Sequence, residues 1–232
     1  YVQFPRQTLQ FKAGDCDDLR AAWCALLEAV GVPTAFITVP GHIYAAFQLD
    51  QDAGEARQSF ATVDDLIFAQ DGTVWVPVET TILKEGFVQA WAAGARQWRE
   101  HSPAGRAVLI PTAEAWGTYA PVAFSVGGFQ VGSPPEAAVR AAFAAEMERL
   151  VAREIRGREQ TLLAALRQQD DPAARNRLGV LYARYGLEDK AREQFNQAVA
   201  RRELAPALIN LGNLEYLKGR MGEATAFYER AV

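Results

Sequence analysis

The stretch AGDCDDL, residues 13–19, has the features of the start of an α-helix. Asp15 is a residue type that caps helix N-termini, and Asp18 stands three residues later, where the partner in a capping box is found. Apolar residues then recur at helical spacing until Gly31, which is a helix-stop signal. The sequence therefore predicts a helix that begins at Cys16 and ends before Gly31.

This position gives Cys16 a potential chemical role. The first residue of a helix lies at the positive end of the helix dipole, which favours the nucleophilic thiolate form of a cysteine. Asp17 and Asp18 oppose that negative charge, so a thiolate here needs an imidazolium partner. Alternatively, Cys16 is a small residue of the capping turn without chemical function. Cys24 lies about 12 Å further along the same expected helix, which is too far for a disulfide with Cys16.

Three β-rich segments follow, and they supply a candidate base and a candidate acid. Residues 34–39 and 42–49 flank a Pro-Gly pair and are expected to form a hairpin, and residues 73–78 form a third strand. His42 begins the second strand and Glu79 follows the third. If these two strands pair antiparallel, the start of one lies beside the end of the other. We therefore expect Cys16, His42 and Glu79 to serve as nucleophile, base and orienting carboxylate.

The remaining N-terminal segments have weaker patterns. Residues 51–59 are polar and are expected to form a loop, and residues 87–100 have a helical pattern. Trp91 and Trp98 lie on one face of that expected helix, where core packing is their expected role. Residues 1–125 are taken as one domain of mixed helix and strand.

After residue 125 the sequence changes character. Residues 126–135 are rich in glycine and proline and are expected to be a linker. Residues 136–171 have a long alanine- and arginine-rich helical pattern and are expected to form a connecting or capping helix. Residues 172–232 contain two copies of one pattern, offset by 33 positions, and five pairs agree in register: Leu178-Gly179 with Leu211-Gly212, Gly186 with Gly219, Ala191 with Ala224, Phe195 with Tyr228, and Ala198 with Ala231.

These paired residues resemble the tetratricopeptide repeat, in which small residues allow two helices to touch and an aromatic ring fills the space between them. The resemblance covers residues 172–232 and implies a pair of helical hairpins, with further repeats after Val232 in a longer protein. The chain departs from the pattern in two ways. The proline that usually closes the repeat is absent near Glu203, and Tyr182 in the first copy corresponds to Glu215 in the second, with Tyr216 beside it. Repeats of this family commonly bind peptides or helices on the inner faces of their first helices. This places Asn176, Asn213 and Tyr216 near an expected protein-binding groove.

Composition excludes several classes of protein. Half of the residues are apolar and 22% are charged, as is usual for a soluble globular chain. The net charge of −4, without a block of lysine and arginine, argues against nucleic-acid binding. No apolar run approaches the roughly 20 residues that span a bilayer. The sequence thus predicts an α+β domain followed by an all-α module, with no membrane-spanning segment in this stretch.

Three motifs of the first domain resemble the bacterial transglutaminase-like superfamily, which is related to papain. They are GDCDD at residues 14–18, VPGH at residues 39–42 and WVPVETT at residues 75–81, and the resemblance covers roughly residues 1–100. It implies a helix-borne cysteine packed on an antiparallel sheet that carries the histidine and the acid. The family usually has aspartate where this chain has Glu79.

The resemblance implies acyl transfer on a peptide or protein amide, with hydrolysis as the first expectation and transfer to an amine as the alternative. The backbone N–H of Cys16 would stabilise the oxyanion, with Gln3 or Tyr1 as candidate side-chain donors. No cofactor is required. Some related proteases hold calcium beside the cysteine, which makes Asp15 and Asp17 candidate ligands, although helix capping is the simpler explanation of both. A different class of function is also consistent with the sequence, namely a protein-binding scaffold that retains the catalytic fold without using it.

Overall fold

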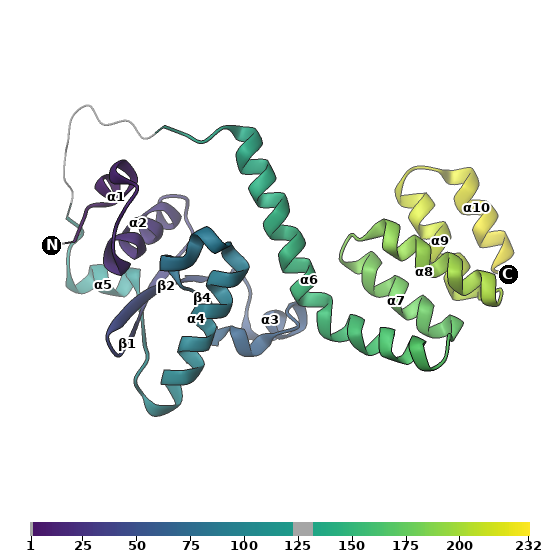
Figure 1. Ribbon diagram of the computed structural model, residues 1–232, viewed down its shortest axis with the longest axis horizontal. Helices are drawn as coiled ribbons and strands as arrows, with labels where there is room; N and C mark the ends of the chain where they lie inside the picture. The colour runs from purple at the N-terminus through teal and green to yellow at the C-terminus, as the bar shows by residue number, and fades with distance from the viewer. Residues whose placement is uncertain (1, 123–131) are drawn as a thin grey trace. The chain divides into compact units, whose positions relative to one another are not determined.

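The computed structural model of the protein describes residues 2–122 and 132–232 (Figure 1). The chain divides into two compact units, residues 1–150 and residues 151–232. Tyr1 and most of the expected linker, residues 126–131, lie outside the described residues. The architecture is α+β, as predicted, because one antiparallel sheet of five strands is combined with many helices.

The N-terminal unit builds its sheet in the order β3-β4-β2-β1-β5, with every neighbouring pair antiparallel. Helices precede, interrupt and follow the strands. The elements are α1 (Pro5–Phe11), α2 (Cys16–Glu28), β1 (Thr34–Val39), β2 (His42–Gln48), α3 (Ala53–Ser59), η1 (Val63–Asp65), β3 (Ile67–Phe68), β4 (Val74–Val78), η2 (Thr80–Glu85), α4 (Phe87–His101), η3 (Ser102–Ala104), β5 (Val108–Pro111) and α5 (Thr112–Thr118).

Local sequence signals explain the start and end of α2. The Asp15 carboxylate accepts hydrogen bonds from the backbone N–H groups of Asp17 and Asp18 at 3.0 and 3.1 Å. The Asp18 carboxylate accepts in return from the Asp15 N–H at 3.2 Å, which completes the capping box. Gly31 follows the helix with φ of 81°, a conformation that favours glycine. The predicted helix start at Cys16 is therefore confirmed.

The expected hairpin and third strand are also confirmed. β1 and β2 are joined through Gly41, whose φ is 73°, and Val39 pairs with His42 directly beside this turn. β2 pairs with β4 such that Ala45 lies opposite Val78. This register brings the start of β2 toward the residues that follow β4.

The expected loop at residues 51–59 is wrong, because residues 53–59 form α3. Its signal is a second capping box: the Asp52 carboxylate accepts from the N–H of Glu55 at 2.9 Å, and the Glu55 side chain accepts from the Asp52 N–H at 3.2 Å. Ala56 points into the core and is fully buried. The polar composition of the segment reflects its exposed faces.

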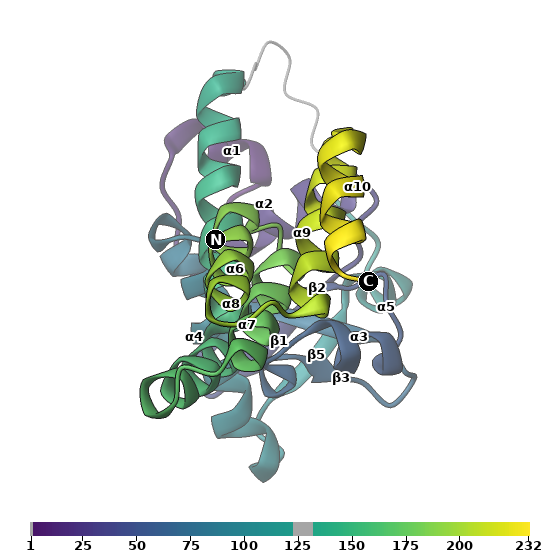
Figure 2. The same ribbon diagram turned by 90° about the vertical axis from the view of Figure 1, so that its right-hand side faces the viewer.

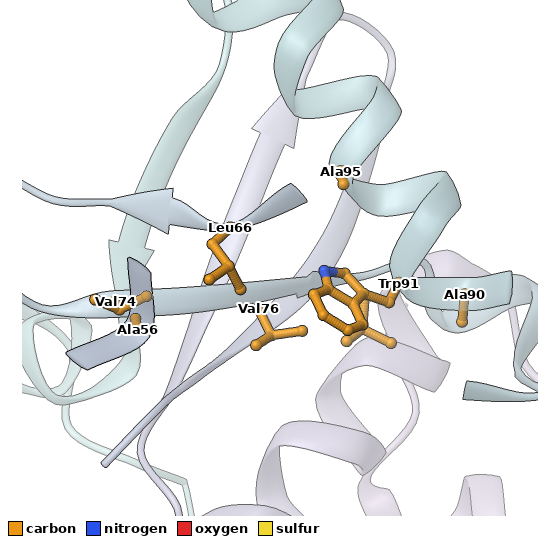
Figure 3. Packing of buried hydrophobic residues seen from close by; sticks show 8 residues of the cluster. Ala56, Leu66, Val74, Val76, Ala90, Trp91 and Ala95 are labelled. Atoms are coloured by element: carbon orange, nitrogen blue, oxygen red, sulfur yellow. The ribbon is translucent and has the colours of Figure 1, made fainter. Parts of the chain in front are cut away.

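A cluster of buried side chains joins α4 to β4 (Figure 3). Trp91 lies against Val76 and donates a hydrogen bond from its indole N–H to the Asp65 carbonyl at 2.8 Å. Trp98 packs against a second cluster that contains Tyr44, so both tryptophans belong to the core, as predicted. The helix approaches the strand closely, since a Cβ added at Gly94 would lie 2.8 Å from the carbonyl carbon of Pro77.

The long helix expected over residues 136–171 is observed as α6 (Glu136–Gln168). Its first half groups with the N-terminal unit and its second half with the C-terminal unit. Leu150 packs against the cluster around Trp91, whereas Ile155 is buried in the core of the helical unit. The boundary between the two units therefore falls within one helix.

The C-terminal unit continues with two helical hairpins, α7 (Pro172–Arg184) with α8 (Glu188–Arg201) and α9 (Ala205–Leu217) with α10 (Met221–Arg230). Figures 1 and 2 show these four helices beside one another. A Cβ added at Gly179 would lie 2.4 Å from the ring of Phe195, and one at Gly212 would lie 2.4 Å from the ring of Tyr228. The repeat in the sequence thus corresponds to the same close helix contact, made twice.

The offset of 33 extends back into α6. The Tyr182 hydroxyl donates to the Glu159 carboxylate at 2.8 Å, and Glu215 forms an ion pair with Arg192. Glu159 and Arg192 are 33 residues apart, as are Tyr182 and Glu215. The end of α6 therefore occupies the position that α8 occupies for the next hairpin. Tyr182 thus contacts an acidic side chain, whereas Glu215 contacts a basic one. The residue at this position therefore differs between the hairpins together with the charge of its partner.

No helix in residues 2–122 or 132–232 is both long enough and apolar enough to cross a membrane.

Candidate active site

The start of β2 and the end of β4 bring His42 and Glu79 together. The Nε2 atom of His42 lies 2.7 Å from the Oε2 atom of Glu79, within hydrogen-bond range. Glu79 is 4% exposed, whereas the His42 side chain is 26% exposed. The imidazole is thus held on a buried carboxylate and keeps access to solvent, and the predicted juxtaposition of the two residues is observed.

The Glu79 carboxylate accepts hydrogen bonds at both oxygens. Oε1 accepts from the backbone N–H of Thr81 at 3.1 Å and from the Thr81 hydroxyl at 2.7 Å. Oε2 accepts from the side-chain amide of Gln97, on α4, at 2.7 Å, in addition to its contact with His42. Because an ionised carboxylate has about four acceptor sites, these groups fill them.

These donors keep Glu79 in its charged form. Burial raises the pKa of this carboxyl, but the hydrogen bonds from Thr81, His42 and Gln97 outweigh burial and hold the pKa below its usual value. An ionised carboxylate can only accept, so the His42 Nε2 atom must carry the proton that it shares with Glu79. The Nδ1 atom is then the one that can accept a proton from a nucleophile.

Tyr44 supports one face of this imidazole. Its ring stacks on His42 with the centroids 6.0 Å apart and an interplanar angle of 19°. The Tyr44 hydroxyl donates to the Gly94 carbonyl of α4 at 3.2 Å. Two residues therefore support the orientation of the His42 ring: Glu79, which follows β4, and Tyr44, which lies on the same strand as His42.

Cys16 occupies the first position of α2, is partly exposed and is a free thiol. Two contacts show the direction in which α2 runs along β1: Cys24 has a hydrogen bond with Thr34, and the guanidinium of Arg20 lies 4.3 Å from the ring centroid of Phe36. Four residues of helix and two of strand both advance about 6 to 7 Å. From the same spacing we expect Cys16 at the level of Thr38, which is one residue before the end of β1.

That end of β1 is where the second strand begins, because Val39 pairs with His42. The contacts along α2 thus direct the thiol toward the turn that carries the imidazole. Within the described residues, the structure records no hydrogen bond between Cys16 and His42. The complete triad of Cys16, His42 and Glu79 accordingly stays a prediction, of which His42 and Glu79 are seen in contact.

The acidic residues around the thiol each have a structural role. Asp15 caps α2, and Asp17 lies 3.7 Å from Arg20. Asp18 accepts from the backbone N–H of Gln3 at 2.6 Å and from its side-chain amide at 2.7 Å. Hydrogen bonding from Gln3, chiefly through its backbone, lowers the pKa of Asp18 below its usual value, so this charge is retained next to the helix start.

This arrangement bears on three expectations about the groups around Cys16, namely two oxyanion donors and a calcium site. The Gln3 side-chain amide donates a hydrogen bond to Asp18, and this bond competes with its expected use as an oxyanion donor. The backbone N–H of Cys16 is one of the first N–H groups of a helix, which lack intrahelical acceptors, so it stays available as the expected donor. Ligand atoms of Asp15, Cys16 and Asp17 lie within 4.8 Å of one another, but Asp15 is already used as a cap, and calcium binding stays a prediction.

Sequence reasoning missed Gln97 and the detailed role of Thr81. Thr81 follows Glu79 by two residues, a spacing at which a hydroxyl and an N–H commonly reach an acidic side chain, so this contact had a local signal. Gln97 had none, because its position depends on how α4 packs against β4.

A large cavity lies elsewhere in the N-terminal unit. It has a volume of about 670 Å³ and lies between the start of α4 and the first half of α6. Its lining is apolar apart from Glu146, and Phe87, Phe143 and Met147 contribute large side chains. A cavity with this lining lacks the nucleophile and base that acyl transfer requires.

Comparisons with known proteins give no assignment. The chain matches no family model, no curated protein and no solved structure. Its chemistry must therefore be inferred from the site itself.

Proposed function

We propose that the protein is a thiol-dependent acyl-transfer enzyme that acts on a peptide or protein amide. The observation that carries this proposal is the contact of 2.7 Å between His42 and Glu79, in which a buried carboxylate fixes a partly exposed imidazole. The direction of α2 along β1 supports Cys16 as the nucleophile, since it leads the thiol toward the same turn. The resemblance to transglutaminase-like enzymes agrees with the order of the three residues.

The proposed reaction begins with transfer of the Cys16 thiol proton to the Nδ1 atom of His42. The thiolate attacks the amide carbonyl, and the backbone N–H of Cys16 donates to the oxyanion that forms. The protonated imidazole gives its proton to the departing amine as the carbon–nitrogen bond breaks, which leaves a thioester on Cys16. Water, activated by His42, then releases a carboxylic acid and restores the thiol. Transfer to a second amine would follow the same course.

Glu79 assists these reaction steps in two ways. It fixes the imidazole with Nε2 protonated, and its charge stabilises the imidazolium that forms when Nδ1 takes the thiol proton. The pKa direction of Glu79 supports this role, because the carboxyl stays ionised as the pH falls below the usual range for glutamate.

We assign the helical unit to docking of a protein substrate or partner through tetratricopeptide-like repeats. The twice-repeated contact of a glycine with an aromatic ring supports this assignment. The expected groove residues differ in availability. Asn176 accepts from Asn210 at 3.0 Å and Asn213 accepts from Tyr228 at 2.9 Å, whereas Tyr216 is 55% exposed. Asn213 and Tyr216 are both exposed and can offer surface to a partner, whereas Asn176 is only partly exposed.

Selective chemistry of the thiol tests the proposal. p-Nitrophenyl acetate, a small activated ester, should acylate Cys16 with release of p-nitrophenolate, and iodoacetamide should alkylate Cys16 at neutral pH. We expect both reactions to be lost in Cys16→Ala and to slow by at least about 100-fold in His42→Ala. The matched control is His101→Ala, because His101 is the second of the two histidines in the chain and lies at the end of α4. Equal rates in His42→Ala and His101→Ala would refute the assignment of His42 as base.

A protein-binding scaffold is the second candidate, and it is favoured by the retained negative charge of Asp18 next to the helix start, which opposes a thiolate at Cys16. The same experiment separates the two functions. A scaffold predicts slow alkylation of Cys16 that does not depend on His42, together with retained binding of a partner by the His42→Ala variant.

A further inference from the structure

We propose that Gln97 is a positioning residue of this site, which holds Glu79 in the conformation and charge state that His42 requires. The inference rests on the proposed function, since it assigns Gln97 a role in orienting the catalytic imidazole. Gln97 lies on α4 and donates from its side-chain amide to the same Oε2 atom that contacts His42.

The need for such a residue follows from the length of the glutamate side chain. Glutamate has one methylene more than aspartate, and therefore one more rotatable bond between the backbone and the carboxylate. Thr81 fixes Oε1, but a carboxylate held at one oxygen can still rotate and move Oε2 away from the imidazole. Gln97 fixes Oε2 from the α4 side. Together the two contacts define the plane of the carboxylate.

The neutral charge of Gln97 suits this role. A lysine or arginine at the position would form an ion pair with Glu79 and reduce the stabilisation that the carboxylate gives to the His42 imidazolium. An amide donates a hydrogen bond without adding charge. The orientation of the amide is determined, because a carboxylate oxygen can only accept and the Gln97 nitrogen must face it.

The packing of α4 makes the position of Gln97 reproducible. One turn before it, Gly94 lies directly against the backbone of Pro77, and its carbonyl accepts from Tyr44 at 3.2 Å. Earlier on the helix, Trp91 is 1% exposed and donates to the Asp65 carbonyl. A helix fixed at these points presents Gln97 to Glu79 from a rigid element rather than from a loop.

The test compares Gln97→Met with wild type by the pH dependence of Cys16 alkylation. Methionine is unbranched and close to glutamine in size but lacks the donor. We expect the rate at neutral pH to fall about 10-fold. The fall of the alkylation rate on the acid side of the pH profile, here called the acid limb, should also move to higher pH. The reason is that the Gln97 hydrogen bond lowers the pKa of Glu79, so its loss raises that pKa. A loss of packing alone would lower the rate without moving the limb.

The matched control is Gln89→Met, which makes the same substitution at an exposed position of α4. A second variant, Gln97→Glu, keeps the shape of the side chain and places a carboxylate against Glu79, so it should move the acid limb further in the same direction. In the background Glu79→Ala, Gln97→Met should cause no further loss of rate, because its target is absent. A loss of equal size in that background would overturn the proposal.

An NMR titration of the Glu79 carboxyl gives a result that does not depend on catalysis. The proposal expects its pKa to rise in Gln97→Met and to stay unchanged in Gln89→Met. If His42→Ala alkylates as fast as wild type, the proposed function fails. If His42→Ala is slow but neither the acid limb nor the Glu79 titration moves in Gln97→Met, the positioning role alone is refuted.

Discussion

Replacement of Gly94 by alanine should destabilise the N-terminal unit, although alanine is the better helix former. A Cβ at this position would lie 2.8 Å from both the carbon and the oxygen of the Pro77 carbonyl and 3.0 Å from the Val78 nitrogen. These are backbone atoms of a central sheet region and cannot rotate away. α4 must therefore move outward from β4, which opens the buried contact around Trp91.

The magnitude follows from two opposing effects. Overpacking a well-packed contact costs typically about 1–3 kcal/mol, and the upper part of that range applies where the obstruction is backbone. The gain from glycine to alanine within a helix is about 1 kcal/mol. We expect the free energy of unfolding to fall by about 1–2 kcal/mol, which lowers the melting temperature of a unit of this size by roughly 2–8 °C.

Tryptophan fluorescence during urea unfolding measures this change in the correct unit. All five tryptophans precede residue 120, so the signal reports on the N-terminal unit and not on the helical repeats. Gly117→Ala in α5 is the matched control, because its Cβ would meet nothing within 4 Å and should not lower stability. A Gly94→Ala protein as stable as Gly117→Ala would refute the close contact between α4 and β4. The variant should also slow alkylation of Cys16, since the movement of α4 carries Gln97 away from Glu79.

Three further outcomes are expected. Gly179→Ala and Gly212→Ala should each destabilise the helical unit by about 1–3 kcal/mol, because the new methyl group meets the aromatic ring of the facing helix. Thermal unfolding followed by circular dichroism should show this loss of stability. The control Gly157→Ala should show no loss, because its Cβ would meet nothing within 4 Å. Because the pKa of Glu79 is held below its usual value, this residue contributes stability above the unfolded-state pKa that is lost as pH falls through the folded-state value. Glu79→Gln should therefore flatten the fall of the urea midpoint with decreasing pH below about pH 5, and an unchanged pH dependence would contradict the assignment. Cys24 is 3% exposed and burial raises its pKa to about 11, so mass spectrometry should find it unmodified by iodoacetamide until the unit unfolds.

The contact between His42 and Glu79 could be predicted from the sequence because it depends on strand pairing. A hairpin fixes where β2 begins, and an antiparallel neighbour must end beside that point. Gln97 could not be predicted, because it reaches Glu79 only after α4 has packed on β4. Periodicity identifies a helix and its buried face, but it does not give the position of the helix along a strand.

The same distinction explains the errors elsewhere in the chain. The two helical hairpins were predicted because a repeated pattern of small and aromatic residues specifies a local contact. α3 was expected to be a loop because its composition is polar, although the capping box of Asp52 and Glu55 marked its start. The boundary within α6 had no signal at all, since helical periodicity continues unchanged from Leu150 into Val151.

The shared helix α6 has a consequence for how the two units could be exchanged or dissected. Most neighbouring domains meet in a loop, so that either can be transplanted without cutting a regular element. Here a cut after Leu150 exposes new helix ends whose N–H and C=O groups lose their partners. A fragment that starts at Pro172 removes Ile155 and Glu159, which the first hairpin contacts through its core and through Tyr182. An intact helical unit must therefore include the second half of α6. A fusion that joins these repeats to another protein would have to continue one helix into another without a break in the helical repeat.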